Sequence, residues 1–370
     1  MPKNQLQIGF VRRGYSASGG AESYLKRLAG GVVDAGFEAR LFASPEWPEA
    51  QWPFGPITRL EGRSPVAFAD ALDASEAWSQ CAGLMSLERV WRCDVFRAGD
   101  GVHRAWLERR SAGSAARKLL DKLSAKHRGA LQLEKSLFAD GGARRVIANS
   151  KMVKAEIIRF YGTDSNNIEV IYNGVPVAEF APQKEFRDRR RAELGLSDRD
   201  VVILFAGSGW ERKGLSAAIA AVESCADSHL HLLVAGRGNA GAFKSSRVRF
   251  LGAVTEMRSL YSAADLFILP TRYDPFSNAC LEALAAGLPV ITTSANGFSE
   301  MIEHGVHGSI VADPRDTREL ADAIRDWSDP QRRDQARATN LKLAAQFDIS
   351  TNVERTLRVL AQVAASAAST

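Results

Sequence analysis

Two adjacent cations, Arg212 and Lys213, follow a short apolar run and are enclosed by glycines, in the sequence Gly207-Ser-Gly-Trp-Glu-Arg-Lys-Gly214. Arginine can hold two oxygens in a fork and lysine acts as a compact point charge, so the pair suits a diphosphate whose charge grows as it leaves. The segment contains neither a Walker phosphate loop nor the GxGxxG dinucleotide fingerprint. Solvated surface charge is the alternative interpretation.

A second segment with chemical potential begins at Asp274 and Pro275. Aspartate followed by proline is a good N-cap and first-turn pair, so it predicts a helix that begins here and ends before Gly287. Capping alone would also explain Asp274. The amides at the start of this helix would face a ligand at the sheet edge, and they belong to Phe276, Ser277 and Asn278.

Glu282 would lie about two turns inside that helix, among alanine, cysteine and leucine. A carboxylate with such neighbours is costly unless a group donates a hydrogen bond to it. A hydroxyl-rich ligand such as ribose would supply that donor. A partly exposed glutamate at the helix edge is the alternative.

A glycine pair, Gly19 and Gly20, stands at the start of a predicted helix after the apolar run 7–11. Glycines at this position let backbone amides approach an anion closely. A tight turn without any ligand would explain the pair equally well.

Short apolar runs must position these residues. They lie at 7–11, 145–148, 201–206, 231–235, 266–269 and 289–293, and helix-forming stretches separate several of them. This pattern predicts parallel strands of an α/β fold, which bind ligands at the carboxyl ends of the strands. The series runs twice around the charged segment 184–193, which we interpret as a solvated helix.

The length of 370 residues favours two domains. We expect an N-terminal domain at 1–175 and a C-terminal domain at 176–351, with an alanine-rich helix at about 352–370 packing back on the first. No apolar run of membrane-spanning length occurs and no hydrophobic signal core follows Met1, so we expect a cytoplasmic protein. Four scattered cysteines argue against a zinc site or a disulfide framework.

The segment 104–128 carries eight Lys or Arg and two acidic residues, with leucines interleaved. A basic amphipathic surface of this kind suits an anionic membrane leaflet. A solvated helix face is the alternative. The candidate membrane contacts are Arg104, Arg109, Arg110, Arg117 and Lys118.

Together these residues resemble the retaining glycosyltransferases of family 4, which have the GT-B architecture of two Rossmann-like domains facing across a cleft. The resemblance rests on Asp274, seven intervening residues and Glu282, with the upstream pair Arg212 and Lys213. Supporting motifs cover nearly the whole chain: Asn149-Ser150, Val170–Val175, Ala235–Gly238, Phe250–Gly252 and Ala285–Ile291.

The resemblance implies that Arg212 and Lys213 bind the donor diphosphate and that Glu282 holds the ribose hydroxyls. Asp274 and the neighbouring amides would hold the transferred sugar and its leaving phosphate, and the Gly19 loop would help to stabilise the diphosphate. The family's first acidic residue is usually glutamate, so Asp274 is one methylene shorter. Neither a metal nor a resident cofactor is expected.

The segment 97–110 resembles that of bacterial lipopolysaccharide-core α-1,3-glucosyltransferases. This resemblance makes Asp100 and His103 candidates for acceptor-side catalysis or sugar contacts, although loop structure would also explain both. It implies transfer of a hexose, glucose from UDP-glucose, to a glycolipid such as the heptose of the lipopolysaccharide inner core. The protein would then act peripherally, at the cytoplasmic face of the inner membrane.

Other classes remain as alternatives. Another donor or an acceptor such as an exopolysaccharide would fit the same family. The pair Asp198 and Asp200 could hold a metal in a single-domain transferase, but it precedes a strand and is interpreted as surface. A nucleic-acid-binding protein lacks an aromatic platform here, and a nicotinamide dehydrogenase lacks its glycine fingerprint.

Overall fold

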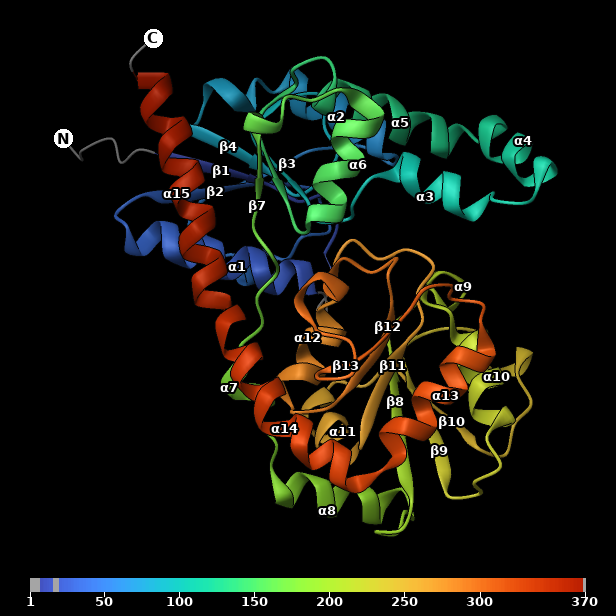
Figure 1. Ribbon diagram of the computed structural model, residues 1–370. Helices are drawn as coiled ribbons and strands as arrows, with labels where there is room; N and C mark the ends of the chain where they lie inside the picture. Colours follow the sequence, from blue (N-terminus) through green and yellow to red (C-terminus); the bar gives the residue numbers. More distant parts are fainter. Residues whose placement is uncertain (1–6, 16–19, 369–370) are drawn as a thin grey trace. The chain divides into compact units, whose positions relative to one another are not determined.

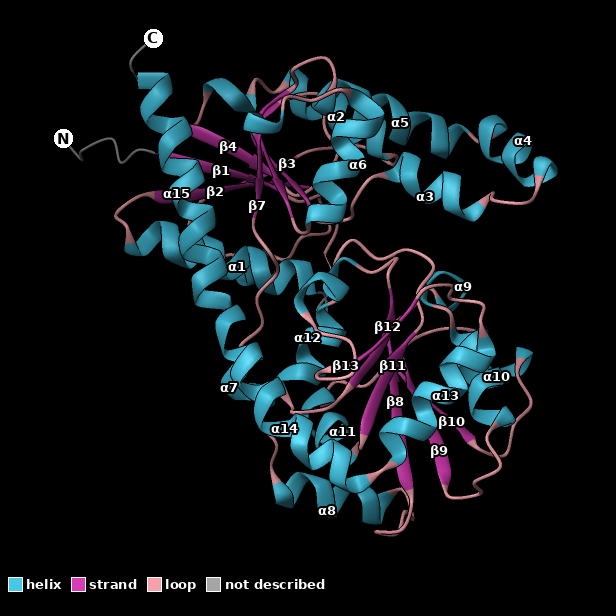
Figure 2. Cartoon of the chain, in the orientation of Figure 1, coloured by secondary structure: helices cyan, strands magenta, loops and turns pink. Residues whose placement is uncertain are grey.

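The computed structural model describes residues 7–15 and 20–368. The chain divides into two compact units, one formed by Met1–Tyr172 with Thr351–Thr370 and the other by Asn173–Ser350. Each unit contains one parallel sheet with helices packed on it, as Figures 1 and 2 show. The expected α/β fold with two Rossmann-like domains is therefore confirmed.

The first unit has a seven-stranded parallel sheet in the order β3-β2-β1-β4-β5-β6-β7. Its strands are β1 (Gln7–Val11), β2 (Glu38–Ala43), β3 (Ile57–Arg59), β4 (Gly83–Ser86), β5 (Cys93–Ala98), β6 (Ala143–Ala148) and β7 (Ile168–Val170). Its helices are α1 (Gly20–Asp34), α2 (Pro65–Ala74), α3 (His103–Arg110), α4 (Ala115–Leu123), α5 (Ala125–Phe138), α6 (Lys151–Tyr161) and most of α15 (Ile349–Ala368).

Helix α15 packs against α1 within this unit. A Cβ atom at Gly31 would lie 2.9 Å from Leu357 and 3.2 Å from Val353, so the missing side chain permits a close approach. The hydroxyl groups of Tyr24 and Thr356 lie 3.2 Å apart across the same contact.

The second unit has a six-stranded parallel sheet in the order β10-β9-β8-β11-β12-β13. Its strands are β8 (Val201–Ala206), β9 (Leu230–Ala235), β10 (Val248–Gly252), β11 (Leu266–Leu269), β12 (Val290–Thr293) and β13 (Gly308–Val311). Its helices are α7 (Val177–Phe180), α8 (Lys184–Glu193), α9 (Trp210–Lys213), α10 (Leu215–Ser224), α11 (Met257–Ala263), α12 (Asn278–Ala285), α13 (Thr317–Ser328) and α14 (Pro330–Ala344).

The order of strands reverses between β8 and β11 in this sheet. Open α/β sheets bind ligands at such a switch point, beyond the carboxyl ends of the two central strands. Lys213 follows β8 and Asp274 follows β11. The fold thus brings two of the predicted site residues to the same edge of one sheet.

The charged segment 184–193 forms α8, but it is only partly the solvated helix that the sequence predicts. Arg191 is 3% exposed and donates to Asp265 at 3.1 Å, while Arg187 donates to the same carboxylate at 2.8 Å. Asp265 immediately precedes β11. One face of α8 is therefore anchored to the sheet by the buried Arg191 and the half-buried Arg187.

Short 3-10 helices complete the described elements: Glu49–Gln51, Ala77–Ser79, Ser165–Asn167, Ala240–Ala242, Gly297–Met301 and Ala345–Phe347. Among the described residues, no helix combines the length and apolar character needed to cross a membrane.

Candidate active site

Two glycines fix the loop that carries the cations. Gly209 and Gly214 adopt φ values of 73° and 79°, and they bracket the single turn of α9. A Cβ atom at Gly214 would lie 1.9 Å from the carbonyl oxygen of Pro270, so only glycine allows the β8 and β11 loops to approach this closely. The Arg212 carbonyl then accepts hydrogen bonds from the Arg272 amide at 2.8 Å and the Thr271 hydroxyl at 2.9 Å.

The cations and Asp274 form one cluster. Lys213 Nζ donates to Asp274 Oδ2, and their side chains are 13% and 7% exposed. Arg212 Nη1 donates to the Tyr273 carbonyl at 2.8 Å and lies 3.9 Å from Asp274 Oδ2. Two cations thus share one carboxylate, which leaves a positive charge beyond what Asp274 neutralises.

The predicted start of the following helix is wrong. Helix α12 begins at Asn278, and its N-cap is Ser277, whose hydroxyl accepts from the Cys280 amide at 3.4 Å. Asp274 instead has its backbone paired with the loop after β12: its amide donates to the Ala295 carbonyl at 3.0 Å. The predicted end before Gly287 is confirmed, because α12 ends at Ala285 and Gly287 has a φ of 75°.

A buried asparagine that sequence reasoning missed organises the start of α12. Asn296 Oδ1 accepts from the amides of Ser277 at 3.2 Å and Phe298 at 3.1 Å, and its side chain is fully buried. The Ser277 amide therefore already has an acceptor within the protein. Of the three predicted amides, that of Asn278 belongs to the first turn of α12, while Phe276 is 5% exposed.

Glu282 is half-buried on α12 and has one partner in the described chain, the Tyr261 hydroxyl, which donates to Oε2 at 2.7 Å. Burial raises the pKa of the Glu282 carboxyl, and the Tyr261 hydrogen bond opposes that rise. Asn278 lies one turn earlier, and its Oδ1 accepts from Asn173 Nδ2 at 2.6 Å. Both polar side chains of this helix are thus oriented by residues from outside it.

Asp100 is exposed in the turn after β5, where Gly101 adopts a φ of 68°. It lies near an ionic group at the switch point of the first sheet, between β1 and β4. There Arg12 pairs with Glu88 at 2.9 Å and with Glu22 at 3.0 Å. Burial by itself lowers the pKa of Arg12. The negative charges of Glu88, Glu22 and, more weakly, Asp100 outweigh that effect, so the pKa of Arg12 is raised overall.

His103 begins α3, and its backbone is held by a buried carboxylate. Glu134 accepts from the amides of His103 at 2.5 Å and Arg104 at 3.2 Å, from Arg89 Nε at 2.9 Å and from the Tyr161 hydroxyl at 2.8 Å. Glu134 is fully buried on α5. No local sequence pattern indicates this contact between α5 and the start of α3, which holds the backbone at His103 and Arg104.

The imidazole of His103 lies 3.0 Å from that of His127, between Nε2 and Nδ1. Burial, followed by the charges of Arg89 and His127, lowers the pKa of His103 to about 4. The ring is therefore neutral near pH 7, a state in which one nitrogen donates and the other accepts.

Gly20 is the first residue of α1, whereas Gly19 lies outside the described residues.

The basic stretch forms α3, α4 and the start of α5. Arg109 pairs with Glu156, Arg110 lies 3.7 Å from Asp121, and Arg104 donates to the Phe160 carbonyl at 3.2 Å. Three leucines of α4 are strongly exposed: Leu119 at 59%, Leu120 at 67% and Leu123 at 64%.

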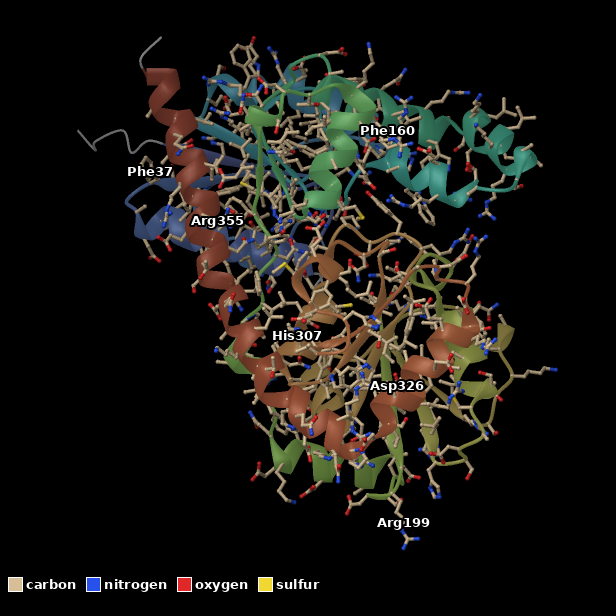
Figure 3. All side chains as sticks on the ribbon, in the orientation of Figure 1. Phe37, Phe160, Arg199, His307, Asp326 and Arg355 are labelled. Carbon is tan, nitrogen blue, oxygen red and sulfur yellow. The ribbon has the colours of Figure 1, made fainter. Side chains whose placement is uncertain are left out.

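A cavity of about 830 Å³ opens between the helices of this region. Figure 3 labels Phe160, on α6, which contributes to its wall. Cationic and apolar side chains both line this cavity, among them Arg104, Leu107, Lys118, Lys122, Leu131 and Arg159. Lys118 is exposed, and Arg117 is half-buried on the same helix.

The Asp198 and Asp200 pair is built into a turn. Asp200 accepts from the amide of Ser197 at 2.7 Å and from its hydroxyl at 2.8 Å, and His229 Nδ1 lies 3.1 Å away. Figure 3 shows Arg199, between the two aspartates, extending outward from this turn. Within residues 7–15 and 20–368, no group of three or more His, Cys, Asp or Glu side chains could hold a metal ion.

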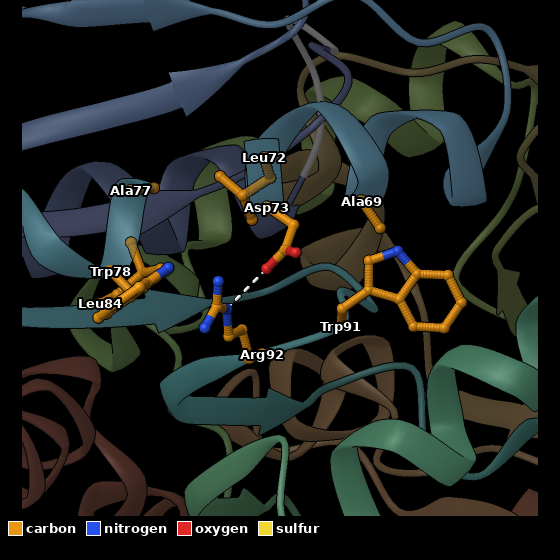
Figure 4. Close-up of a pocket in the computed structure, with 8 residues that line it drawn as sticks. All are labelled: Ala69, Leu72, Asp73, Ala77, Trp78, Leu84, Trp91 and Arg92. Carbon is orange, nitrogen blue, oxygen red and sulfur yellow. Dashed lines mark hydrogen bonds and ion pairs between the residues drawn. The ribbon is translucent and has the colours of Figure 1, made fainter. Parts of the chain in front are cut away.

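A crevice between α2 and the strands β4 and β5, shown in Figure 4, is filled by its own side chains. Arg92 donates to Asp73 at 2.6 Å and lies 4.3 Å over the Trp78 ring. The crevice encloses no volume for a water-sized molecule, so it is a packing contact and no binding site.

The fold is that of the GT-B glycosyltransferases. It is similar to the crystal structure of WaaG, a glycosyltransferase involved in lipopolysaccharide biosynthesis, with a TM-score of 0.81, 20% identity and coverage of 95% of this chain and 99% of that one. The structure of Anabaena HepE in complex with UDP and glucose matches with a TM-score of 0.75 and 20% identity, covering 96% and 100%.

Sequence similarity identifies the family. Residues 200–329 match the group 1 glycosyl transferases, and residues 18–179 match glycosyltransferase family 4. The chain is 30% identical over 305 residues to a probable transglycosylase of Burkholderia thailandensis, covering 80% of each protein. This chain therefore belongs to the group 1, family 4 type of glycosyltransferases.

Other relatives match over shorter stretches. The lipopolysaccharide glucosyltransferase WaaG of Escherichia coli K12 is 26% identical over 219 residues, 56% of this chain and 59% of that protein. An uncharacterized glycosyltransferase of Methanocaldococcus jannaschii is 33% identical over 178 residues, 44% and 46%. The chain thus spans about half the length of these curated relatives.

The alternative of a nucleic-acid-binding protein is not favoured, because the sequence similarity is to glycosyltransferases.

Proposed function

We propose that this protein transfers a hexose from a nucleoside diphosphate to a hydroxyl of a membrane glycolipid, with retention at the anomeric carbon and without a metal. UDP-glucose is the proposed donor, and a heptose of the lipopolysaccharide inner core is the proposed acceptor. The observation that carries the proposal is the cluster of Arg212, Lys213 and Asp274 at the switch point of the second sheet.

The donor assignment is supported by charge. Arg212 and Lys213 both pair with the single carboxylate of Asp274, so a diphosphate that enters this cluster meets a positive site. The amide of Asn278 at the start of α12 adds a donor, and Glu282 accepts from the ribose of the same nucleotide. The HepE structures, which contain UDP or UDP-glucose, have the same fold.

The proposed reaction breaks the bond between the anomeric carbon and the β-phosphate oxygen and forms a bond to the acceptor oxygen on the same face. The proton of the acceptor hydroxyl passes to an oxygen of the leaving phosphate. Arg212 and Lys213 stabilise the charge that develops on the diphosphate. Asp274 holds Lys213 in place and, in this proposal, contacts the transferred sugar.

The first unit is the proposed acceptor domain. Asp100 is exposed and can accept hydrogen bonds from sugar hydroxyls, and the neutral ring of His103, three residues further along the chain, can donate or accept one. The exposed leucines of α4 and the cations around its cavity suit an anionic leaflet. Each cation close to such a surface contributes about 1 kcal/mol. We therefore propose peripheral binding at the cytoplasmic face of the inner membrane.

A screen of UDP-, GDP- and ADP-sugars for donor hydrolysis, read by mass spectrometry, tests the donor assignment. We expect UDP-glucose to be hydrolysed, and Lys213→Ala to abolish the signal while the fold is retained. Lys184→Ala is the matched control, because Lys184 is an exposed lysine of α8 paired with Asp188. Full activity of Lys213→Ala, or hydrolysis of other donors alone, would contradict the assignment.

A further inference from the structure

Tyr261 holds a fixed position behind the helix that carries Glu282. Its side chain is fully buried on α11, and its ring packs against Phe180 at 5.6 Å and Phe267 at 6.0 Å between ring centres. Its hydroxyl lies 2.7 Å from Glu282 Oε2 and 3.3 Å from the Ala279 carbonyl. Because the ring is buried and packed between two aromatic side chains, its hydroxyl is held within hydrogen-bond distance of the carboxylate.

The direction of this hydrogen bond follows from the chemistry of the two groups. Burial, then the Glu282 charge, raises the pKa of Tyr261 well above its usual value, so the phenol keeps its proton. The carboxylate accepts it. Among the described residues, Glu282 has this one hydrogen-bond partner, which occupies Oε2 and leaves Oε1 to accept from a ligand.

A carboxylate that is already held in one orientation, as Glu282 is by Tyr261, binds a hydroxyl more favourably than a mobile one. A glutamate side chain loses rotamer freedom when it is immobilised, and that loss weakens binding. Tyr261 has already imposed the loss in the protein without nucleotide. The helix adds its own constraint, since Asn278 on the same face is held by Asn173.

We infer that Tyr261 is a positioning residue for nucleotide recognition: through its hydrogen bond to Oε2 it presents Oε1 of Glu282 to a hydroxyl of the donor's ribose. The inference rests on the proposed function, in which Glu282 accepts from the ribose. It assigns the ribose preference of the enzyme to a pair of residues on two helices, α11 and α12.

The test is calorimetric titration of the full chain with UDP, 2′-deoxy-UDP and 3′-deoxy-UDP. A hydrogen bond to a charged group is worth about 1.5–3 kcal/mol, so the wild type should bind UDP about 10- to 100-fold more tightly than at least one deoxy analogue. Tyr261→Phe keeps the ring and removes the donor. It should reduce that preference by about 5-fold or more, mainly by weakening UDP binding, while the deoxy analogue binds nearly as before.

Two further variants separate positioning from packing. Tyr161→Phe removes the same type of bond, from a tyrosine hydroxyl to the buried Glu134, in the other unit, and should leave the UDP preference unchanged. Glu282→Gln should lose the preference by itself. If Tyr261 acts through Glu282, the double variant should bind UDP no more weakly than Glu282→Gln alone.

Each outcome has a distinct meaning. A wild-type preference that persists in Tyr261→Phe would overturn the inference and leave the proposed function standing. A wild type that does not bind UDP, or that binds all three nucleotides equally, would overturn the ribose role of Glu282 and the inference with it. If the two changes weaken UDP binding additively, Tyr261 does not act through Glu282, and the inference is refuted.

Discussion

Replacing Lys213 by methionine separates the structural role of the cation from its chemical role. The change removes the charge and keeps most of the side-chain volume. Asp274, whose side chain is 7% exposed, then loses its closest ionic partner and, within the described part of the chain, keeps Arg212 at 3.9 Å. Breaking a buried ion pair costs about 3–5 kcal/mol when no other partner remains. With Arg212 still present, we expect a loss of about 2 kcal/mol in the free energy of unfolding.

The double variant Lys213→Met, Asp274→Asn also removes the negative charge of Asp274, which the single variant leaves without its lysine partner. Stability should return to within about 1 kcal/mol of the wild type, since neither charge is left unpaired. Transfer should not return. Loss of one group that stabilises developing charge lowers kcat about 10²- to 10³-fold, and both variants lack that group.

The two properties are measured separately, by urea unfolding and by initial rates of UDP release. A loss of about 2 kcal/mol corresponds to a fall of about 4–8 °C in Tm for a domain of this size, which a thermal melt also detects. Recovery of both stability and turnover in the double variant would refute the reasoning, because it would show that Lys213 acts only by neutralising Asp274.

Three other predictions follow from the first unit. The pKa of His103 is lowered to about 4, below the usual value of about 6.5. Between these two pH values the unfolded chain binds more protons than the folded one, so the free energy of unfolding should fall as the pH decreases from 6.5 to 4. Urea unfolding of His103→Gln should show a weaker fall, and the same pH dependence as in the wild type would contradict the lowered pKa. Glu134→Gln should lower the free energy of unfolding by about 2–4 kcal/mol, because a neutral amide replaces a buried carboxylate that accepts four hydrogen bonds. A thermal melt equal to that of the wild type would refute this role of Glu134. Replacing Leu119, Leu120 and Leu123 by serine should release the protein from anionic vesicles in a sedimentation assay, and persistent binding would exclude α4 as the contact. These leucines are better suited to the test than Arg109 and Arg110, because the two arginines form ion pairs within the protein.

Local chemistry predicts part of the candidate site. Arg212, Lys213 and Glu282 are candidates because a glycine-flanked cation pair and a carboxylate among apolar residues each need a partner of opposite character. The structure pairs the cations with Asp274 and Glu282 with Tyr261, and binding of a donor by these residues stays a prediction. The apolar runs that became β8, β9, β11 and β12 were equally clear, since strands buried on both faces consist mainly of apolar residues.

The rest depended on tertiary contacts. Asp274 and Pro275 have the local signature of a helix start, but pairing with the loop after β12 determines the backbone of Asp274 and moves the cap to Ser277. Tyr261 and Glu134 act on partners 21 and 31 residues away, and no sequence period connects them. Strand β2 was missed because its sequence, EARLFA, mixes charged residues with apolar ones.

The packing of α15 on α1 has a consequence for synthesis on the ribosome. The first unit is discontinuous, and its last helix emerges only after the whole of Asn173–Ser350 has been translated. At about 5–20 residues per second, that stretch takes on the order of ten to forty seconds. Throughout this interval, the surface around Gly31 that later receives Leu357 remains uncovered. The N-terminal half therefore cannot complete its packing until the second unit has been made.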